Sequence, residues 1–162
     1  AFDLIIVDST DPFGPGESLF TREFYGNCLH ALKEDGILVN QHEGPYYRED
    51  AEEAAAIYKK TTSIFPVAKV YQAHIPTYPA GHWLFGFMSK RYHPLCDLDA
   101  ERWEARGLET RYYNTSLHQG AFALPTFVER LLEKGEILDD VFLRTVDERI
   151  WPKDNDEDDH DD

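Results

Sequence analysis

The sequence predicts an α/β fold built on a mostly parallel sheet with one antiparallel edge strand. The chain opens on an apolar run at residues 4–7 that ends in Asp8, which is typical of a strand buried on both faces of a parallel sheet. Segments with helical spacing then alternate with further short apolar runs. The last of these runs follows its predecessor too closely for the crossover that a parallel pair requires, so it is expected to pair antiparallel.

The elements follow in order along the chain. Thr21 is the predicted N-cap of a helix that continues to Lys33 and ends at Asp35-Gly36. Residues 36–40 predict the second strand, 49–64 a second helix rich in Ala and Glu, and 67–75 the third strand. After a loop at 76–81, residues 83–88 predict the antiparallel edge strand, and 98–106 and 125–134 are expected to be short surface helices.

Composition limits the classes of partner. The chain has 162 residues, 42% of them hydrophobic, and a net charge of −15, which is enough apolar material for one domain or for half of a larger one. An acidic surface repels phosphate backbones and attracts small cations, so nucleic acid is not expected as a partner. The two cysteines are expected to be structural thiols in a reducing compartment, and the seven histidines lack paired metal-ligand spacing, so no metal site is expected. With neither a membrane-spanning run nor a signal-peptide pattern, a soluble cytoplasmic protein is expected, without membrane association.

The segment DSTDPFGPG at residues 8–16 carries the most chemical information. Asp8 stands just past the carboxyl end of a predicted parallel strand, where open α/β sheets bind ligands. Because Pro12 disfavours a helical Asp11, residues 8–11 are expected to form a turn that brings the two carboxylates within about 7 Å. Repulsion between them raises the proton affinity of at least one, and an amine ligand lowers it again. The alternative is an Asp-rich turn that caps the following structure.

Two further segments are candidates for ligand contact. In IPTYPAGHW, residues 75–83, two prolines flank Tyr78, which predicts a stiff loop that holds its ring and hydroxyl in place, with Trp83 adding an aromatic face. The alternative is a hairpin connection whose tyrosine packs on the core. Gln41 and Glu43 follow the second strand and are therefore expected on the same rim as Asp8, where one of them contacts a ligand nitrogen. The alternative is that both are ordinary polar surface residues. The chain contains no glycine-rich phosphate or dinucleotide loop.

Together these segments resemble the spermidine synthase, or polyamine aminopropyltransferase, family of bacterial type. The resemblance rests on D-S-T-D-P-F-G-P at residues 8–15, I-P-T-Y-P-A-G at 75–81, and the pattern R-Y-Y-N-x-x-L-H-x-x-A-F-x-L-P-x-F-V at 111–128. It implies a Rossmann-like fold of the class I methyltransferase type. Residues 1–136 would be the C-terminal portion of the catalytic domain, without its N-terminal β domain and first Rossmann half, 137–152 a C-terminal extension, and 153–162 a disordered acidic tail.

The resemblance also implies roles for individual residues. Asp8 would be the catalytic base, and the polyamine would be bound by Asp11, Gln41 and Tyr78. The nucleoside donor would be lined by Thr10, Pro15, Gly16 and Leu19, and Gly16 stands where the family usually has alanine. The implied reaction transfers an aminopropyl group from decarboxylated S-adenosylmethionine, a co-substrate, to putrescine, which yields spermidine and methylthioadenosine with no permanently bound cofactor.

Alternatives stay open at this point. The chain alone is expected to need the N-terminal half for full activity, with a homo-oligomer or that complementing half as its protein partner. The other hypotheses are a non-catalytic truncated or split-gene subunit, a polyamine-binding module, and a related putrescine N-methyltransferase.

Overall fold

The computed structural model describes residues 1–8, 18–78 and 80–138 of the chain, and these residues form a four-stranded sheet. The strand order is β1-β2-β4-β3, where the strands are β1 (Phe2–Val7), β2 (Leu32–Gln41), β3 (Val67–His74) and β4 (His82–Ser89). β1 pairs parallel with β2, while β4 pairs antiparallel with both β2 and β3. β1, β2 and β3 therefore run in one direction, and β4 alone runs against them.

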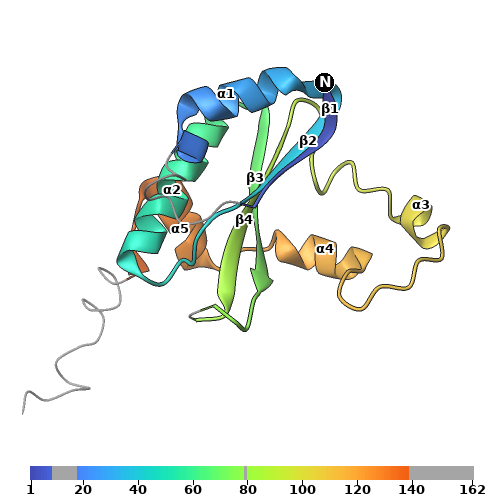
Figure 1. The fold of residues 1–162 in the computed structure, drawn as a ribbon. Helices are drawn as coiled ribbons and strands as arrows, with labels where there is room; N and C mark the ends of the chain where they lie inside the picture. Colours follow the sequence, from blue (N-terminus) through green and yellow to red (C-terminus); the bar gives the residue numbers. More distant parts are fainter. Residues whose placement is uncertain (9–17, 79, 139–162) are drawn as a thin grey trace, which may run out of the picture.

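Helices cover the two faces unequally. α1 (Arg22–Ala31), α2 (Arg48–Thr62) and α5 (Thr126–Lys134) lie together on one side of the sheet, whereas α4 (Thr115–Ala121) lies across β3 on the other, and α3 (Ala100–Glu104) stands further out (Figure 1). The main core lies between the sheet and α1 and α2, and it is built around Tyr25, Leu38, Ile57 and Met88. A second cluster joins Val128 of α5 to the sheet. The face opposite these helices is left partly open, and its side chains form the site described below.

Local sequence explains where the helices begin and end. The Thr21 hydroxyl accepts a hydrogen bond from the Phe24 amide at 3.1 Å, which confirms the predicted N-cap of α1. The Asn114 side chain caps α4 in the same way, accepting from the Leu117 amide at 2.7 Å. α5 stops at Gly135, whose φ of 70° lies in the left-handed region that glycine adopts without steric cost.

The α/β class and the mixed sheet are confirmed, but four details differ from prediction. β4 lies inside the sheet rather than at its edge, because it inserts between β2 and β3. α1 ends at Ala31 instead of Lys33, and β2 begins at once with Leu32. α5 buries Val128 and Leu131 against α2 and is not simply a surface helix. α4 was not predicted.

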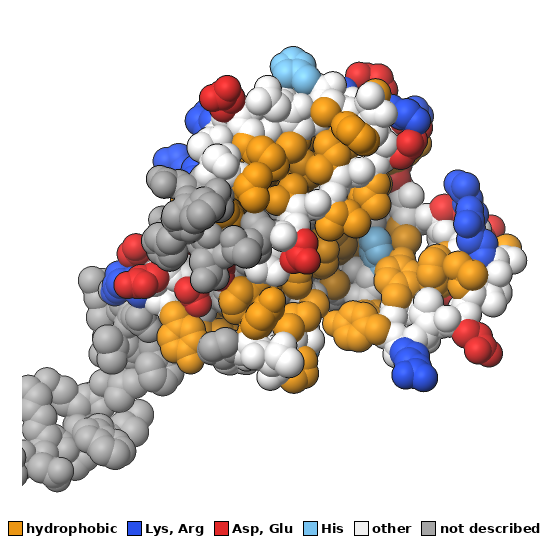
Figure 2. All heavy atoms as spheres, in the orientation of Figure 1, with side chains coloured by type: hydrophobic (Ala, Val, Ile, Leu, Met, Phe, Trp, Pro, Cys, Tyr) orange, Lys and Arg blue, Asp and Glu red, His pale blue; other side chains and the backbone are white. Residues whose placement is uncertain are grey.

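The predicted burial of β1 on both faces is wrong for the described structure. Phe2, Leu4 and Ile6 are 59%, 52% and 65% exposed, because β1 is an edge strand and only its alternate residues face α1. Figure 2 shows hydrophobic side chains gathered in a broad band across the face of the molecule drawn there. An edge strand with an exposed apolar row is a surface prone to pair with another chain.

Candidate functional site

Asp8 and Gln41 lie at the same end of the sheet, where the parallel strands β1 and β2 finish. Val7 at the end of β1 pairs with Asn40 of β2, so Asp8 and Gln41 are the next residues out on two parallel neighbours. Both line a hollow of about 230 Å³, whose wall is completed by Ile6, Val7, Val39, Asn40, Tyr71 and Phe85. The rings of Tyr71 and Phe85 stack with their centroids 5.3 Å apart and an interplanar angle of 19°. An exposed carboxylate, an amide and two aromatic rings thus face one small space.

A second hollow, of about 570 Å³, lies on the other side of Asp8. It follows β1 and α1 and is lined by Leu19 together with Phe24, Asn27 and Cys28 of α1. Leu19 is half-buried and packs against the main core. Ile6, Val7 and Asp8 line both hollows, so the Asp8 carboxylate stands between a space with a polar amide and a wider, mainly apolar space.

This combination of groups is suited to a positively charged nitrogen. A carboxylate pairs with an ammonium ion and accepts a proton from it, an amide oxygen accepts a hydrogen bond, and aromatic faces attract cations. Among the described residues, no group of three or more His, Cys, Asp or Glu side chains is arranged to hold a metal ion.

Tyr78 lies on the loop between β3 and β4, at the same end of the sheet. Its ring packs on Trp83 with the centroids 4.4 Å apart, and the residue is 39% exposed. The loop is closed by Ile75 N–H donating to Gly81 O at 2.8 Å and by Tyr78 N–H donating to Ile75 O at 3.0 Å. Tyr78 is not among the residues that line either hollow. The structure therefore brings Asp8 together with Gln41 and Leu19, and leaves Tyr78 against Trp83.

The residues behind Gln41 are polar and buried. Asn40 and His42 are only 3% and 1% exposed, and Glu43 is also buried. The Asn40 amide nitrogen donates to the Tyr25 hydroxyl at 2.9 Å, but within the described residues Asn40 Oδ1 and both ring nitrogens of His42 find no hydrogen-bond partner. Burial lowers the pKa of His42 to about 3, so the ring is neutral at physiological pH.

Gly86 of β4 makes room for this buried pair. A Cβ at Gly86 would overlap Asn40 Oδ1 and lie 2.7 Å from His42 Nε2, both closer than real contacts allow. Gln41 thus lines the hollow, while the uncharged polar side chains on either side of it in the sequence, Asn40 and His42, pack against Gly86.

Comparison with known proteins places the fold. The family model described as "Spermine/spermidine synthase domain" matches residues 1–100, more than half of the chain. The chain belongs to the spermine/spermidine synthase family. This confirms the resemblance drawn from the three motifs.

Two relatives in this family are polyamine aminopropyltransferases. The protein of Alkaliphilus oremlandii is 67% identical over 135 residues, which cover 83% of this chain and 48% of the relative. That of Clostridium beijerinckii is 67% identical over 131 residues, covering 81% and 46%. The chain thus spans about half the length of the curated relatives it matches.

Solved structures of the spermine/spermidine synthase family agree. A spermidine synthase crystallised with the transition-state analogue AdoDATO superposes with a TM-score of 0.76 at 43% identity, covering 81% of this chain and 44% of that one. Spermidine synthase from Thermotoga maritima gives 0.74 at 42% identity, covering 81% and 43%. The Rossmann-like fold expected from the resemblance is therefore confirmed.

Four of the family residues expected at the site, namely Thr10, Asp11, Pro15 and Gly16, lie outside the described residues. So do nearly all of the expected extension and the acidic tail. In the other direction, sequence reasoning missed Tyr71 and Phe85 in the wall of the Asp8 hollow. Their signal was the alternation of aromatic residues along β4 and the single tyrosine of β3, which becomes informative only once Gln41 and Tyr71 are both known to pair with Phe85. In the described residues, no helix has the length and apolar character needed to cross a bilayer.

Proposed function

We propose that this chain carries the amine-activating side of a spermidine synthase site, with Asp8 as the general base. The reaction is transfer of an aminopropyl group from decarboxylated S-adenosylmethionine to putrescine, which gives spermidine and methylthioadenosine. The observation that supports it most is the place of Asp8 between two hollows, one shared with Gln41 and the other with Leu19. The membership of the family and the two aminopropyltransferase relatives give the reaction class.

The chemistry requires a base at this point. An alkylammonium ion with a pKa of about 10.4 is neutral in only about one of a few thousand molecules at pH 7, which costs roughly 4 to 5 kcal/mol. In the proposed step the Asp8 carboxylate accepts that proton. The freed nitrogen lone pair attacks the propyl carbon next to the sulfonium, and the carbon–sulfur bond breaks to leave a neutral thioether. A positioned carboxylate contributes typically about 10² to 10⁴ in rate.

The neighbours of Asp8 have supporting roles in the proposal. Gln41 orients the attacking amine through its side-chain amide, and Leu19 contacts the nucleoside of the donor. Asp11 and Tyr78 are proposed to bind the rest of the polyamine, and Thr10, Pro15 and Gly16 to line the donor. Two cationic substrates held in line react faster than free ones because the entropy of bringing them together is already lost on binding.

The test is a chimera in which this chain replaces its matching region in the Alkaliphilus oremlandii relative. The chimera is expected to form spermidine from putrescine and decarboxylated S-adenosylmethionine, measured by mass spectrometry, and Asp8→Asn should lower turnover by about 10² to 10⁴. Asp3→Asn is the matched control, because Asp3 is also an exposed aspartate, on β1, the strand that Asp8 follows, but it lines neither hollow and is paired with Lys33 at 2.8 Å. Its turnover should be unchanged.

Three results would count against the proposal. Wild-type turnover in Asp8→Asn excludes that residue as the base. A folded chimera that binds putrescine without forming product favours a polyamine-binding module or a non-catalytic subunit. Consumption of S-adenosylmethionine with formation of N-methylputrescine identifies the related methyltransferase instead.

A further inference from the structure

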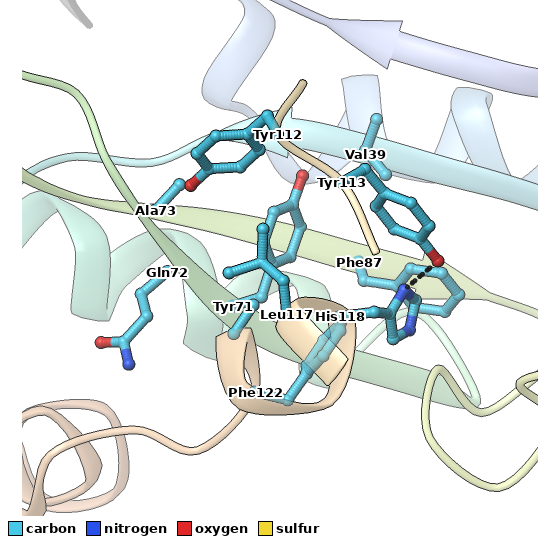
Figure 3. A pocket seen from close by; sticks show the side chains of 11 residues that line it. Val39, Tyr71, Gln72, Ala73, Phe87, Tyr112, Tyr113, Leu117, His118 and Phe122 are labelled. Atoms are coloured by element: carbon cyan, nitrogen blue, oxygen red, sulfur yellow. Dashed lines mark hydrogen bonds between the residues drawn. The ribbon is translucent and has the colours of Figure 1, made fainter. Parts of the chain in front are cut away.

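A third space, a pocket of about 280 Å³, lies on the open face of the sheet, beneath α4. We call it the aromatic pocket. Tyr71 and Phe87 come from β3 and β4, and Tyr112, Tyr113, His118 and Phe122 come from α4 and the residues on either side of it (Figure 3). Its volume is close to the lower end of the range for small-ligand pockets. None of the functional residues proposed above lies in its wall.

The aromatic walls are packed against each other before any ligand arrives. Phe122 lies between the two sides, with its ring centroid 5.4 Å from that of Tyr71 and 6.3 Å from that of Phe87. Tyr113 is held from outside by Trp103, edge-on at 4.6 Å. Aromatic side chains fixed in this way lose little conformational entropy when a ligand binds.

Hydrogen bonds orient one of the hydroxyl groups as an acceptor. His118 Nε2 lies 2.8 Å from the Pro94 carbonyl oxygen, which can only accept, so this nitrogen carries the proton of the neutral ring. His118 Nδ1 is then an acceptor, and it receives the Tyr113 hydroxyl proton at 3.1 Å. The lone pairs of the Tyr113 oxygen remain available for a donor. Figure 3 shows the Tyr71 hydroxyl pointing into the space between Tyr112 and Tyr113.

The polar groups of the pocket are uncharged. Among the described residues that line it, none is Asp, Glu, Lys or Arg. Burial raises the pKa of both Tyr71 and Tyr113 above the ordinary value, so both hydroxyls stay neutral at physiological pH. Electron-rich ring faces and hydroxyl oxygens favour a cation with N–H donors, and the net charge of −15 concentrates small cations around the molecule.

We propose that the aromatic pocket binds a primary alkylammonium group, one end of an aliphatic amine, at a site distinct from Asp8. The ammonium lies against the rings of Tyr71 and Phe122 and donates to the Tyr113 oxygen, while the aliphatic stem contacts Leu117 and Val39. Val39 and Tyr71 also line the Asp8 hollow, so the two amine sites share a wall. This site does not depend on Asp8 being a catalytic base.

The test is a titration of the 162-residue chain with n-butylamine, followed by NMR of ring-labelled tyrosines, with 1-butanol as an uncharged probe of similar stem. Butylamine should shift the Tyr71 and Tyr113 signals and saturate, and butanol should bind about tenfold more weakly or worse. Tyr113→Phe should weaken butylamine binding about tenfold, because it removes a hydrogen bond to a charged group. Phe122→Leu should also weaken it, since a ring face is lost.

Two controls locate the binding. Tyr47→Phe alters an exposed tyrosine outside the pocket and should leave the affinity unchanged, and Asp8→Asn should leave the shifts of Tyr113 unchanged. Equal affinity for butanol and butylamine, or shifts that never saturate, would overturn the proposal. So would binding that survives both Tyr113→Phe and Phe122→Leu but disappears in Asp8→Asn, because the amine would then occupy only the Asp8 hollow.

Discussion

Acidification should destabilise this protein through His42. The ring is 1% exposed, and burial lowers its pKa from the ordinary 6.5 to about 3. In the unfolded chain the same histidine takes up a proton near pH 6.5, whereas the folded protein keeps it neutral. Below pH 6.5 the unfolded state therefore binds more protons than the native state, and the free energy of unfolding falls as the pH falls.

The size of this effect follows from the two pKa values. With 6.5 in the unfolded state and about 3 in the native state, linkage gives a loss of about 2 kcal/mol between pH 8 and pH 5, and about 3 kcal/mol by pH 4. Little of the effect appears above pH 7. A domain of this size is typically stable by about 5 to 15 kcal/mol, so the loss at pH 5 is readily measured.

Urea unfolding followed by circular dichroism at pH 8, 6 and 5 measures the effect directly. His42→Leu removes the titrating ring, and because that ring has no hydrogen-bond partner within the described residues, the change should be nearly neutral at pH 8. At pH 5 the variant should be more stable than wild type by about 2 kcal/mol. His30→Gln, at an exposed position of α1, is the control and should follow the wild-type curve. If His42→Leu shows the same pH dependence as wild type, the reasoning from burial is refuted.

Three further predictions concern packing and association. Gly86→Ala should destabilise by about 1 to 3 kcal/mol, because its Cβ would overlap the buried polar pair, whereas Gly26→Ala, with nothing within 4 Å, should stabilise α1 by about 0.5 to 1 kcal/mol; thermal unfolding of both variants checks the opposite signs. Leu131→Ala should cost about 2 to 5 kcal/mol in urea unfolding, and Glu133→Ala, exposed on the same helix, should change little. The wild-type chain should associate as its concentration rises, and Ile6→Lys should reduce this in sedimentation velocity, whereas a monodisperse wild-type monomer would contradict the importance of the exposed β1 row.

Local patterns in the sequence were sufficient for most of the elements. The N-cap at Thr21, the helix of α2 and the strands β3 and β4 were predicted within a few residues, because each depends on neighbours in the chain. The position of β4 inside the sheet could not be predicted in this way, since strand order depends on which edges meet in three dimensions. α4 was missed because seven residues with an internal glycine leave little periodic signal.

The candidate site likewise has a part that the local sequence predicts and a part that depends on how the strands pair. The carboxyl ends of parallel strands lie at the same end of a sheet, and this rule was enough to predict that Asp8 and Gln41 are neighbours. In the structure both residues line one hollow. Tyr71 and Phe85 could not be added, because their place beside Gln41 depends on the register of two antiparallel pairs. The burial of His42 was also out of reach of the sequence, since a lone histidine after a strand fits a surface position as well as a buried one.

The reversed direction of β4 determines how the rim around Tyr78 can change. The loop between β3 and β4 begins after His74 and ends before His82. These two residues pair with each other, so both ends of the loop lie at the same end of the sheet. A parallel β4 would instead need a crossover of a dozen or more residues that returns to the opposite end of the sheet. Insertions or deletions in residues 75–81 can therefore reshape the rim around Tyr78 while every strand keeps its register. Exchange of this short segment between relatives thus changes the rim and leaves the core untouched, and under the proposed function it is a route to altered acceptor preference.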